Sequence, residues 1–195
     1  MAARLFGQDD LHGGPMTPTE RERALAHLEK TRDECRQLAQ KLSPSQFHYK
    51  PAADQWSVAE LLEHIIVVES RVLDRIDNAL RQSPSPSKSA MQDDHLVRLV
   101  ADRTGKLKAP EVVVPTGRWP EHRLLPEFEA VRKRSLDFAR STSADLRQHG
   151  FPHPFFGELD CYQWLLAIPA HCERHLAQAR EVMAHPGFPR AATAS

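Results

Sequence analysis

Residues 56–76 read WSVAELLEHIIVVESRVLDRI, and this stretch carries the strongest structural signal in the chain. It opens with a capping box, because Ser57 can cap the third helical residue while Glu60 reaches back to the cap. Trp56 before the cap and Leu61 after it can pack together as a hydrophobic staple. The residues that follow are apolar on nearly every side, which is typical of a helix at the centre of its fold.

Other segments carry helix signals of the same kind. Thr17 and Glu20 form a capping box around Pro18. Asp160 and Gln163 mark the start of the last helix in the same way. Apolar residues then recur at steps of three and four, as the buried face of a helix requires. We therefore expect four helices, at about residues 17–42, 57–81, 122–141 and 160–184, with a short helical piece near 94–103.

This order of helices and connections predicts an all-α fold. Without a strand pattern, the helices are expected to form a four-helix bundle. The short connection between the first two helices predicts that they are antiparallel neighbours. The long connection over residues 82–121 permits a crossover between helices two and three, and so an up-down-down-up order. We expect one bundle domain over residues 17–184, with a flexible arm at 1–16 and a flexible tail at 185–195.

Composition narrows the functional classes. The chain has 195 residues, which suits a single domain with one core. Basic and acidic residues number 26 each, and this balance favours neither nucleic acid nor an anionic membrane as a partner. No apolar run is long enough to cross a membrane, and the N-terminus resembles no secretory signal. Cys35, Cys161 and Cys172 form no disulfide framework, so we expect reduced thiols and a cytoplasmic location.

Three histidines are candidates for chemistry. His171 and His175 are four residues apart, so both imidazoles lie on one face of the last helix. His64 interrupts the apolar run of the second helix. Buried imidazoles need partners, and one metal ion would satisfy all three rings. The competing interpretation is structural: an i,i+4 pair also arises by chance, and a single histidine on an apolar face is often a core residue with a hydrogen bond.

The remaining polar motifs indicate structural roles. Glu173 lies two residues after His171, whereas the zincin motif has its glutamate directly after the first histidine. Cys172 fits a small core residue. His149 and His153 lie in a connection and are expected to face solvent, although a loop at the mouth of the bundle could bring one of them near a site. Arg118 in the crossover is expected at the surface, with a role in holding an anionic cosubstrate as the alternative. No residue stands out as a general base, so catalytic residues other than metal ligands stay unassigned.

Several segments together resemble the DinB/YfiT-like superfamily of helical-bundle metalloenzymes. The matching segments are residues 56–64, 109–111, 115–119, 153–157 and 164–178. The first resembles the family's signature on helix two, which ends in a metal histidine at His64. The last resembles the signature on helix four, with metal histidines at His171 and His175. The resemblance implies an up-down-down-up bundle, one divalent metal ion and, often, a homodimer.

The resemblance also implies candidate activities. Some relatives transfer low-molecular-weight thiols, so the first hypothesis is a metal-dependent enzyme that activates such a thiol for S-transfer to a small-molecule substrate. A metal-dependent hydrolase is the second enzymatic hypothesis. Two hypotheses involve no catalysis: a metal- or ligand-binding stress protein, and a plain helical interaction protein whose histidines are structural. Three imidazoles accept zinc, nickel or iron, so the metal stays open.

Overall fold

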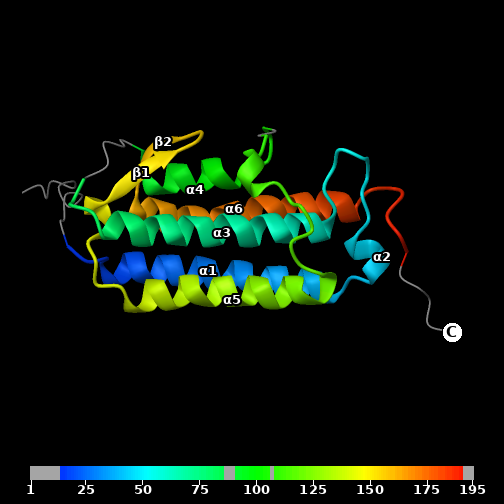
Figure 1. Ribbon diagram of the computed structural model, residues 1–195, viewed down its shortest axis with the longest axis horizontal. Helices are drawn as coiled ribbons and strands as arrows, with labels where there is room; N and C mark the ends of the chain where they lie inside the picture. The colour runs from blue at the N-terminus through cyan, green and yellow to red at the C-terminus, as the bar shows by residue number, and fades with distance from the viewer. Residues whose placement is uncertain (1–13, 86–90, 106–107, 191–195) are drawn as a thin grey trace, which may run out of the picture.

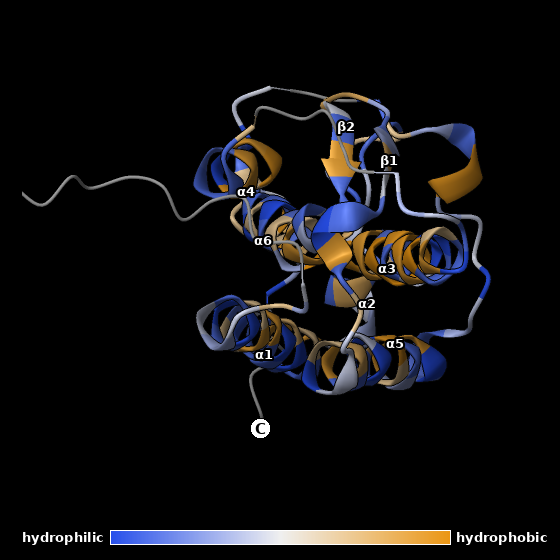
Figure 2. Ribbon diagram, turned by 90° about the vertical axis from the view of Figure 1, so that its left-hand side faces the viewer, coloured by the Kyte–Doolittle hydropathy of each residue, from blue (hydrophilic) through white to orange (hydrophobic). Residues whose placement is uncertain are grey.

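The computed structural model describes residues 14–85, 91–105 and 108–190. Four long helices form its body: α1 (Pro18–Gln40), α3 (Val58–Leu80), α5 (Glu121–Ser141) and α6 (Cys161–Met183). They lie in two layers, with α3 beside α6 and α1 beside α5 (Figure 2). Along the bundle α1 and α6 run in one direction and α3 and α5 in the other (Figure 1). The predicted all-α bundle with up-down-down-up order is therefore confirmed.

The predicted helix starts are also confirmed. Thr17, Ser57 and Asp160 each accept a hydrogen bond from the third residue of the helix that follows. In each case the glutamate or glutamine at that third position reaches back to the backbone of the cap. Because these bonds join residues three apart, they form wherever the local sequence allows them.

The long crossover between α3 and α5 contains two short helices. One is α4 (Asp93–Ala101), which packs along α6 (Figure 1). The other is a 3₁₀ turn, η1 (Glu111–Val113), which contacts α3. The short helix expected near 94–103 is thus present, and it ends two residues earlier than expected. By returning along α6, α4 brings the chain back to the end of the bundle where α5 can begin parallel to α3.

The first two long helices are not neighbours, contrary to the sequence-based expectation. The main contacts between long helices join α1 or α3 to α5 or α6, and α1 and α3 lie diagonally across the bundle (Figure 2). The connection between them is long enough to cross the end of the bundle. It includes a further short helix, α2 (Pro44–Phe47), with its own capping box from Ser43 and Gln46. The chain length of this connection, residues 41–57, allows the diagonal arrangement.

A β-hairpin replaces the irregular connection expected before α6. Strands β1 (Gly150–His153) and β2 (Gly157–Asp160) pair antiparallel, with Phe151 opposite Leu159. The hairpin follows a second 3₁₀ turn, η2 (Leu146–Gln148). Its backbone is fixed to α6, because the Trp164 indole donates to the Phe151 carbonyl at 3.0 Å and the two rings stack at 4.5 Å. The hairpin thus depends on packing, and its four-residue strands carry little periodic signal.

One buried ion pair ties three helices together at the core. Arg132 on α5 donates two hydrogen bonds to Glu69 on α3, both at 2.8 Å, and it is fully buried. Its remaining terminal nitrogen donates to the Leu28 carbonyl and the Thr31 hydroxyl on α1. Within the core the charges are therefore paired and hydrogen-bonded, as burial requires.

Arg147 joins the helix starts at one end of the bundle. It forms ion pairs with Glu20 of α1, Asp93 of α4 and Asp160, the cap of α6, at 2.8, 2.6 and 3.0 Å. Acidic residues are favourable at helix N-termini, and one guanidinium forms ion pairs with three of them. These contacts place the start of α6, and therefore the register of the histidines along it.

Both ends of the described chain contact the bundle. Met16 is buried, although it falls in the arm predicted at 1–16, and residues 1–13 lie outside the description. In the predicted tail, His185 forms a 2.6 Å hydrogen bond with the Tyr49 hydroxyl, and the Pro189 carbonyl accepts from Gln46 at 2.9 Å. Among the residues described, no helix is both long and apolar enough to span a bilayer.

Candidate metal centre

The structure brings the three predicted histidines together between α3 and α6. The Nε2 atom of His171 lies 3.2 Å from Nε2 of His64 and 3.1 Å from Nε2 of His175. One ligand atom from each residue lies within 4.8 Å of those of the other two. Sequence reasoning placed His171 and His175 on one helical face, and the packing of α3 against α6 adds His64.

The centre is enclosed. His64 and His175 are 4% and 7% exposed, and His171 is half-buried. Trp56, the residue before the cap of α3, contacts two of the rings, with centroid distances of 4.9 Å to His64 and 6.4 Å to His175. The tryptophan predicted as a helix staple therefore also forms part of the wall of the centre.

Hydrogen bonds fix the protonation of two rings. Nδ1 of His64 lies 2.8 Å from the Val113 carbonyl, which can only accept, so Nδ1 carries the hydrogen. Nδ1 of His175 lies 3.0 Å from Oε1 of Gln178 and carries its hydrogen for the same reason. In a neutral imidazole the other nitrogen then has a free lone pair. Both Nε2 atoms therefore direct lone pairs at Nε2 of His171.

This donor set fits a cation. One N–H on Nε2 of His171 can satisfy only one of the two facing lone pairs, and the other stays unmatched. A metal ion accepts all three lone pairs at once. Two nitrogens bound to a tetrahedral ion at its usual bond length lie about 3.3 Å apart. The two closest nitrogen pairs, at 3.1 and 3.2 Å, are near that spacing.

Electrostatics favour the neutral, ligating form of the rings. Burial lowers the pKa of His171 and of His175 well below the ordinary histidine value, and the neighbouring histidines lower it further. Burial also lowers the pKa of His64, although the hydrogen bond to Val113 opposes this. The lowered pKa values favour the uncharged imidazole in all three rings, which is the form that ligates a metal.

Glu63 orders the loop that orients His64. The sequence analysis did not identify Glu63 as a functional residue. Its buried carboxylate accepts hydrogen bonds from the backbone nitrogens of Thr116, Gly117 and Arg118, at 2.7, 3.0 and 3.2 Å. Arg118 adds an ion pair at 2.8 Å. The available signal was a glutamate on the apolar half of a central helix, next to a candidate ligand.

Comparison with known proteins identifies the family. The model of the DinB superfamily matches residues 27–179. This chain belongs to the DinB superfamily. The uncharacterized protein YuaE of Bacillus subtilis (strain 168) is 28% identical over 149 residues, which cover 72% of this chain and 85% of YuaE.

A solved structure has a similar helical-bundle fold. This structure is that of YfiT from Bacillus subtilis, which is described as a probable metal-dependent hydrolase with an unusual four-helix bundle topology. It matches with a TM-score of 0.61 and 14% identity, over 94% of this chain and 97% of YfiT. TT2238, described as a four-helix bundle protein, matches with a TM-score of 0.49 and 24% identity, over 83% and 98% of the two chains. The likeness to YfiT shows a common fold.

The remaining polar residues singled out in this DinB chain lie outside the centre. Cys172 is fully buried in the core, as expected. Glu173 forms an ion pair with Lys30 at 2.7 Å, and its carboxylate lies 3.2 Å from Nε2 of His27. Arg118 is not a plain surface residue, because it pairs with Glu63. Helix α6 continues through Pro169 to Met183.

The two loop histidines are half-buried, so the expectation that they face solvent is wrong. His149 bonds the Ala79 carbonyl through Nδ1 at 3.0 Å. His153 packs on the rings of Phe156 and Trp164, with centroid distances of 4.5 and 4.9 Å. The hairpin causes both contacts, because it lays this segment on the bundle.

Proposed function

We propose that this protein is a metal-dependent enzyme that holds one divalent ion through Nε2 of His64, His171 and His175. The observation that carries the proposal is the pair of lone pairs, from His64 and His175, directed at the Nε2 of His171. Three protein ligands leave at least one coordination position for a reactant, which is typical of catalytic sites. When bound, such an ion lowers the pKa of a coordinated water or thiol and so supplies a nucleophile at neutral pH.

The residues around the three histidines fix and shield them. The Val113 carbonyl and the Gln178 amide oxygen each hold one imidazole in the tautomer that ligates through Nε2. Trp56 packs on two rings and keeps bulk water from that side. Glu63 accepts four hydrogen bonds, so its oxygens are committed to the loop, and we assign it a positioning role in place of a general base.

The nucleophile defines two candidate reactions. The family resemblance supports a low-molecular-weight thiol, which would be transferred through sulfur to a small electrophilic substrate. The description of YfiT supports the second candidate, in which water is the nucleophile and the reaction is hydrolysis. Both need the same three ligands, and zinc, nickel and iron all suit imidazole nitrogen.

Metal content tests the site. Protein without a tag, purified without chelators, is analysed by mass spectrometry beside His64→Ala and His171→Ala variants. His95→Ala, at an exposed position on α4, is the matched control. We expect about one equivalent of metal in the wild type and the control, and loss of metal in both ligand variants with the helical circular dichroism retained. A wild type that takes up no zinc, nickel or ferrous iron would remove the basis of the proposal.

Cobalt substitution tests which nucleophile the centre takes. A thiol that coordinates cobalt adds a sulfur-to-metal charge-transfer band to the absorption spectrum, and the band should be absent from His171→Ala. A thiol band together with turnover of an electrophile supports S-transfer. Ester or amide cleavage without a thiol effect supports hydrolysis. If the metal-bound protein catalyses neither S-transfer nor hydrolysis, it is instead a non-catalytic metal-binding protein.

A further inference from the structure

A groove of about 290 Å³ lies between α3, α5 and the crossover. Val112 lines it, whereas the carbonyl of the next residue, Val113, accepts the hydrogen bond from His64. The three histidines are not among its lining residues. The groove and the metal centre are therefore lined by different residues, although the same crossover segment borders both. The volume of the groove is close to the lower limit for small-molecule sites.

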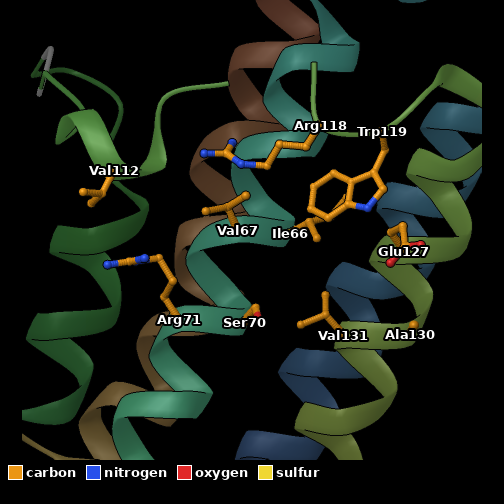
Figure 3. Close-up of a pocket in the computed structure, with 10 residues that line it drawn as sticks. All are labelled: Ile66, Val67, Ser70, Arg71, Val112, Arg118, Trp119, Glu127, Ala130 and Val131. Carbon is orange, nitrogen blue, oxygen red and sulfur yellow. The ribbon is translucent and has the colours of Figure 1, made fainter. Parts of the chain in front are cut away.

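Two arginines make the groove electropositive. Arg71 and Arg118 extend from α3 and from the crossover, and both guanidinium groups reach toward the side where Val112 lies (Figure 3). Arg118 uses one terminal nitrogen, Nη1, for Glu63. Arg71 has no hydrogen-bond or ion-pair partner in the part of the chain that the structure describes. The carboxylate at the other side of the groove, Glu127, is already bound by Arg123.

Apolar side chains form the rest of the wall. Ile66 and Val67 lie in the middle of the view, and the Trp119 indole lies over Ile66 (Figure 3). Val112 is 57% exposed, which is unusual for a large apolar residue of this protein. The groove thus offers cationic groups at one side and a flat aromatic surface with aliphatic neighbours at the other.

We propose that this groove binds a small organic oxyanion, a carboxylate or a phosphate monoester, that carries one flat apolar group. Arg71 and the free nitrogens of Arg118 would donate to the oxyanion, because guanidinium groups match both anions with paired hydrogen bonds. Trp119 would pack against the apolar group, as aromatic rings do in ligand sites. No proposed metal ligand lines the groove, so anion binding there can be tested without the metal.

Calorimetric titration of the metal-free full chain tests this site. The probes are benzoate, phenyl phosphate and neutral benzamide, which share a ring and differ in charge. We expect both anions to bind and benzamide not to bind, and the tighter anion identifies the preferred source of the oxyanion. Arg71→Gln should weaken binding about tenfold or more, since it removes charge-assisted bonds. Arg98→Gln changes charge equally at an exposed position on α4 and should leave binding unchanged.

A second variant blocks the groove without removing charge. Val67→Phe fills its middle while both arginines stay, and we expect it to abolish binding of either anion. His64→Ala should bind the anions like the wild type, so a failed metal site and a failed groove are distinguishable. The proposal is overturned if neither anion binds the wild type at millimolar concentration, or if Arg71→Gln binds as the wild type does. A dimer that Val67→Phe dissociates, without anion binding, would also overturn it and assign the groove to a second copy.

Discussion

Glu63 and His64 are consecutive residues of α3, and both bind the same segment of the crossover. The Glu63 carboxylate accepts from the backbone nitrogens of residues 116–118, and Nδ1 of His64 donates to the Val113 carbonyl. The first interaction fixes the loop on the helix, and the second uses that loop to orient a candidate metal ligand. Glu63 therefore helps to orient the neighbouring His64 ring through the loop that both residues bind.

Replacement of Glu63 by glutamine is expected to weaken metal binding. The neutral amide cannot accept as strongly from the loop or neutralise Arg118, so the Val113 carbonyl is held less firmly against His64. Loss of such an outer partner typically lowers metal affinity about 10- to 100-fold. Competition with a chromophoric chelator measures the change. Glu22→Gln, an exposed glutamate on α1, is the control, and equal affinity of the two variants would contradict the positioning role.

Gly117→Ala tests the turn in the same loop. Gly117 has a φ of 73°, where an L-residue with a side chain is strained, and an added Cβ would meet no atom within 4 Å. The cost therefore comes from the backbone alone, and we expect about 1–2 kcal/mol of lost stability, with weaker metal binding. Gly105→Ala is the matched control, because that glycine also has open space and no positive φ. Urea unfolding of both variants checks the prediction, which fails if they are equally stable.

Glu69→Gln is expected to destabilise the fold strongly. It leaves the guanidinium of Arg132 fully buried without a counter-charge. Breaking one side of a buried ion pair costs about 3–5 kcal/mol. Replacement of both residues by apolar ones, Glu69→Leu with Arg132→Met, should recover much of this loss. The exposed pair of Lys133 and Asp137 provides the control, since Asp137→Asn should cost less than about 1 kcal/mol in urea unfolding.

His153 makes stability depend on pH. Burial, with the nearby Arg75 charge, lowers its pKa to about 4. Above pH of about 6.5 the ring is neutral in the folded and the unfolded chain. Below that value His153 binds a proton in the unfolded chain but stays neutral in the folded chain, so the free energy of unfolding falls as the pH drops toward 4.

His153→Phe should therefore flatten the pH profile of metal-free protein. We expect the stability lost between pH of about 7 and 5 to shrink by about 1 kcal/mol, because this ring no longer takes up a proton on unfolding. Chemical unfolding at both pH values gives the difference, independent of any constant packing effect. His122→Phe replaces an exposed histidine on α5 as the control. An unchanged slope in His153→Phe would show that other groups carry the pH dependence.

Local signals predicted the parts of the fold that depend on neighbours in sequence. The three capping boxes join residues three apart, and the histidines of α6 share a face because they are four apart. The apolar run around His64 made it the third candidate, and the family resemblance supported all three. The hairpin escaped prediction because its strands are held by the Trp164 indole. The diagonal placement of α1 and α3 could not be predicted, because the length of their connection limits how far apart the two helices lie but does not determine which helices pack side by side.

The sequence by itself determined where the long helices begin, that they form one bundle, and which histidines are candidates for a metal. Only the tertiary structure decided what surrounds them. The Val113 carbonyl lies 49 residues from His64 along the chain, and the loop held by Glu63 lies 53–55 residues from that glutamate. The physical reason is range: a helix cap or an i,i+4 face is set by local backbone geometry. The tautomer of His64, the pairing of Glu63 and the electropositive groove depend on side chains that meet only after the helices pack.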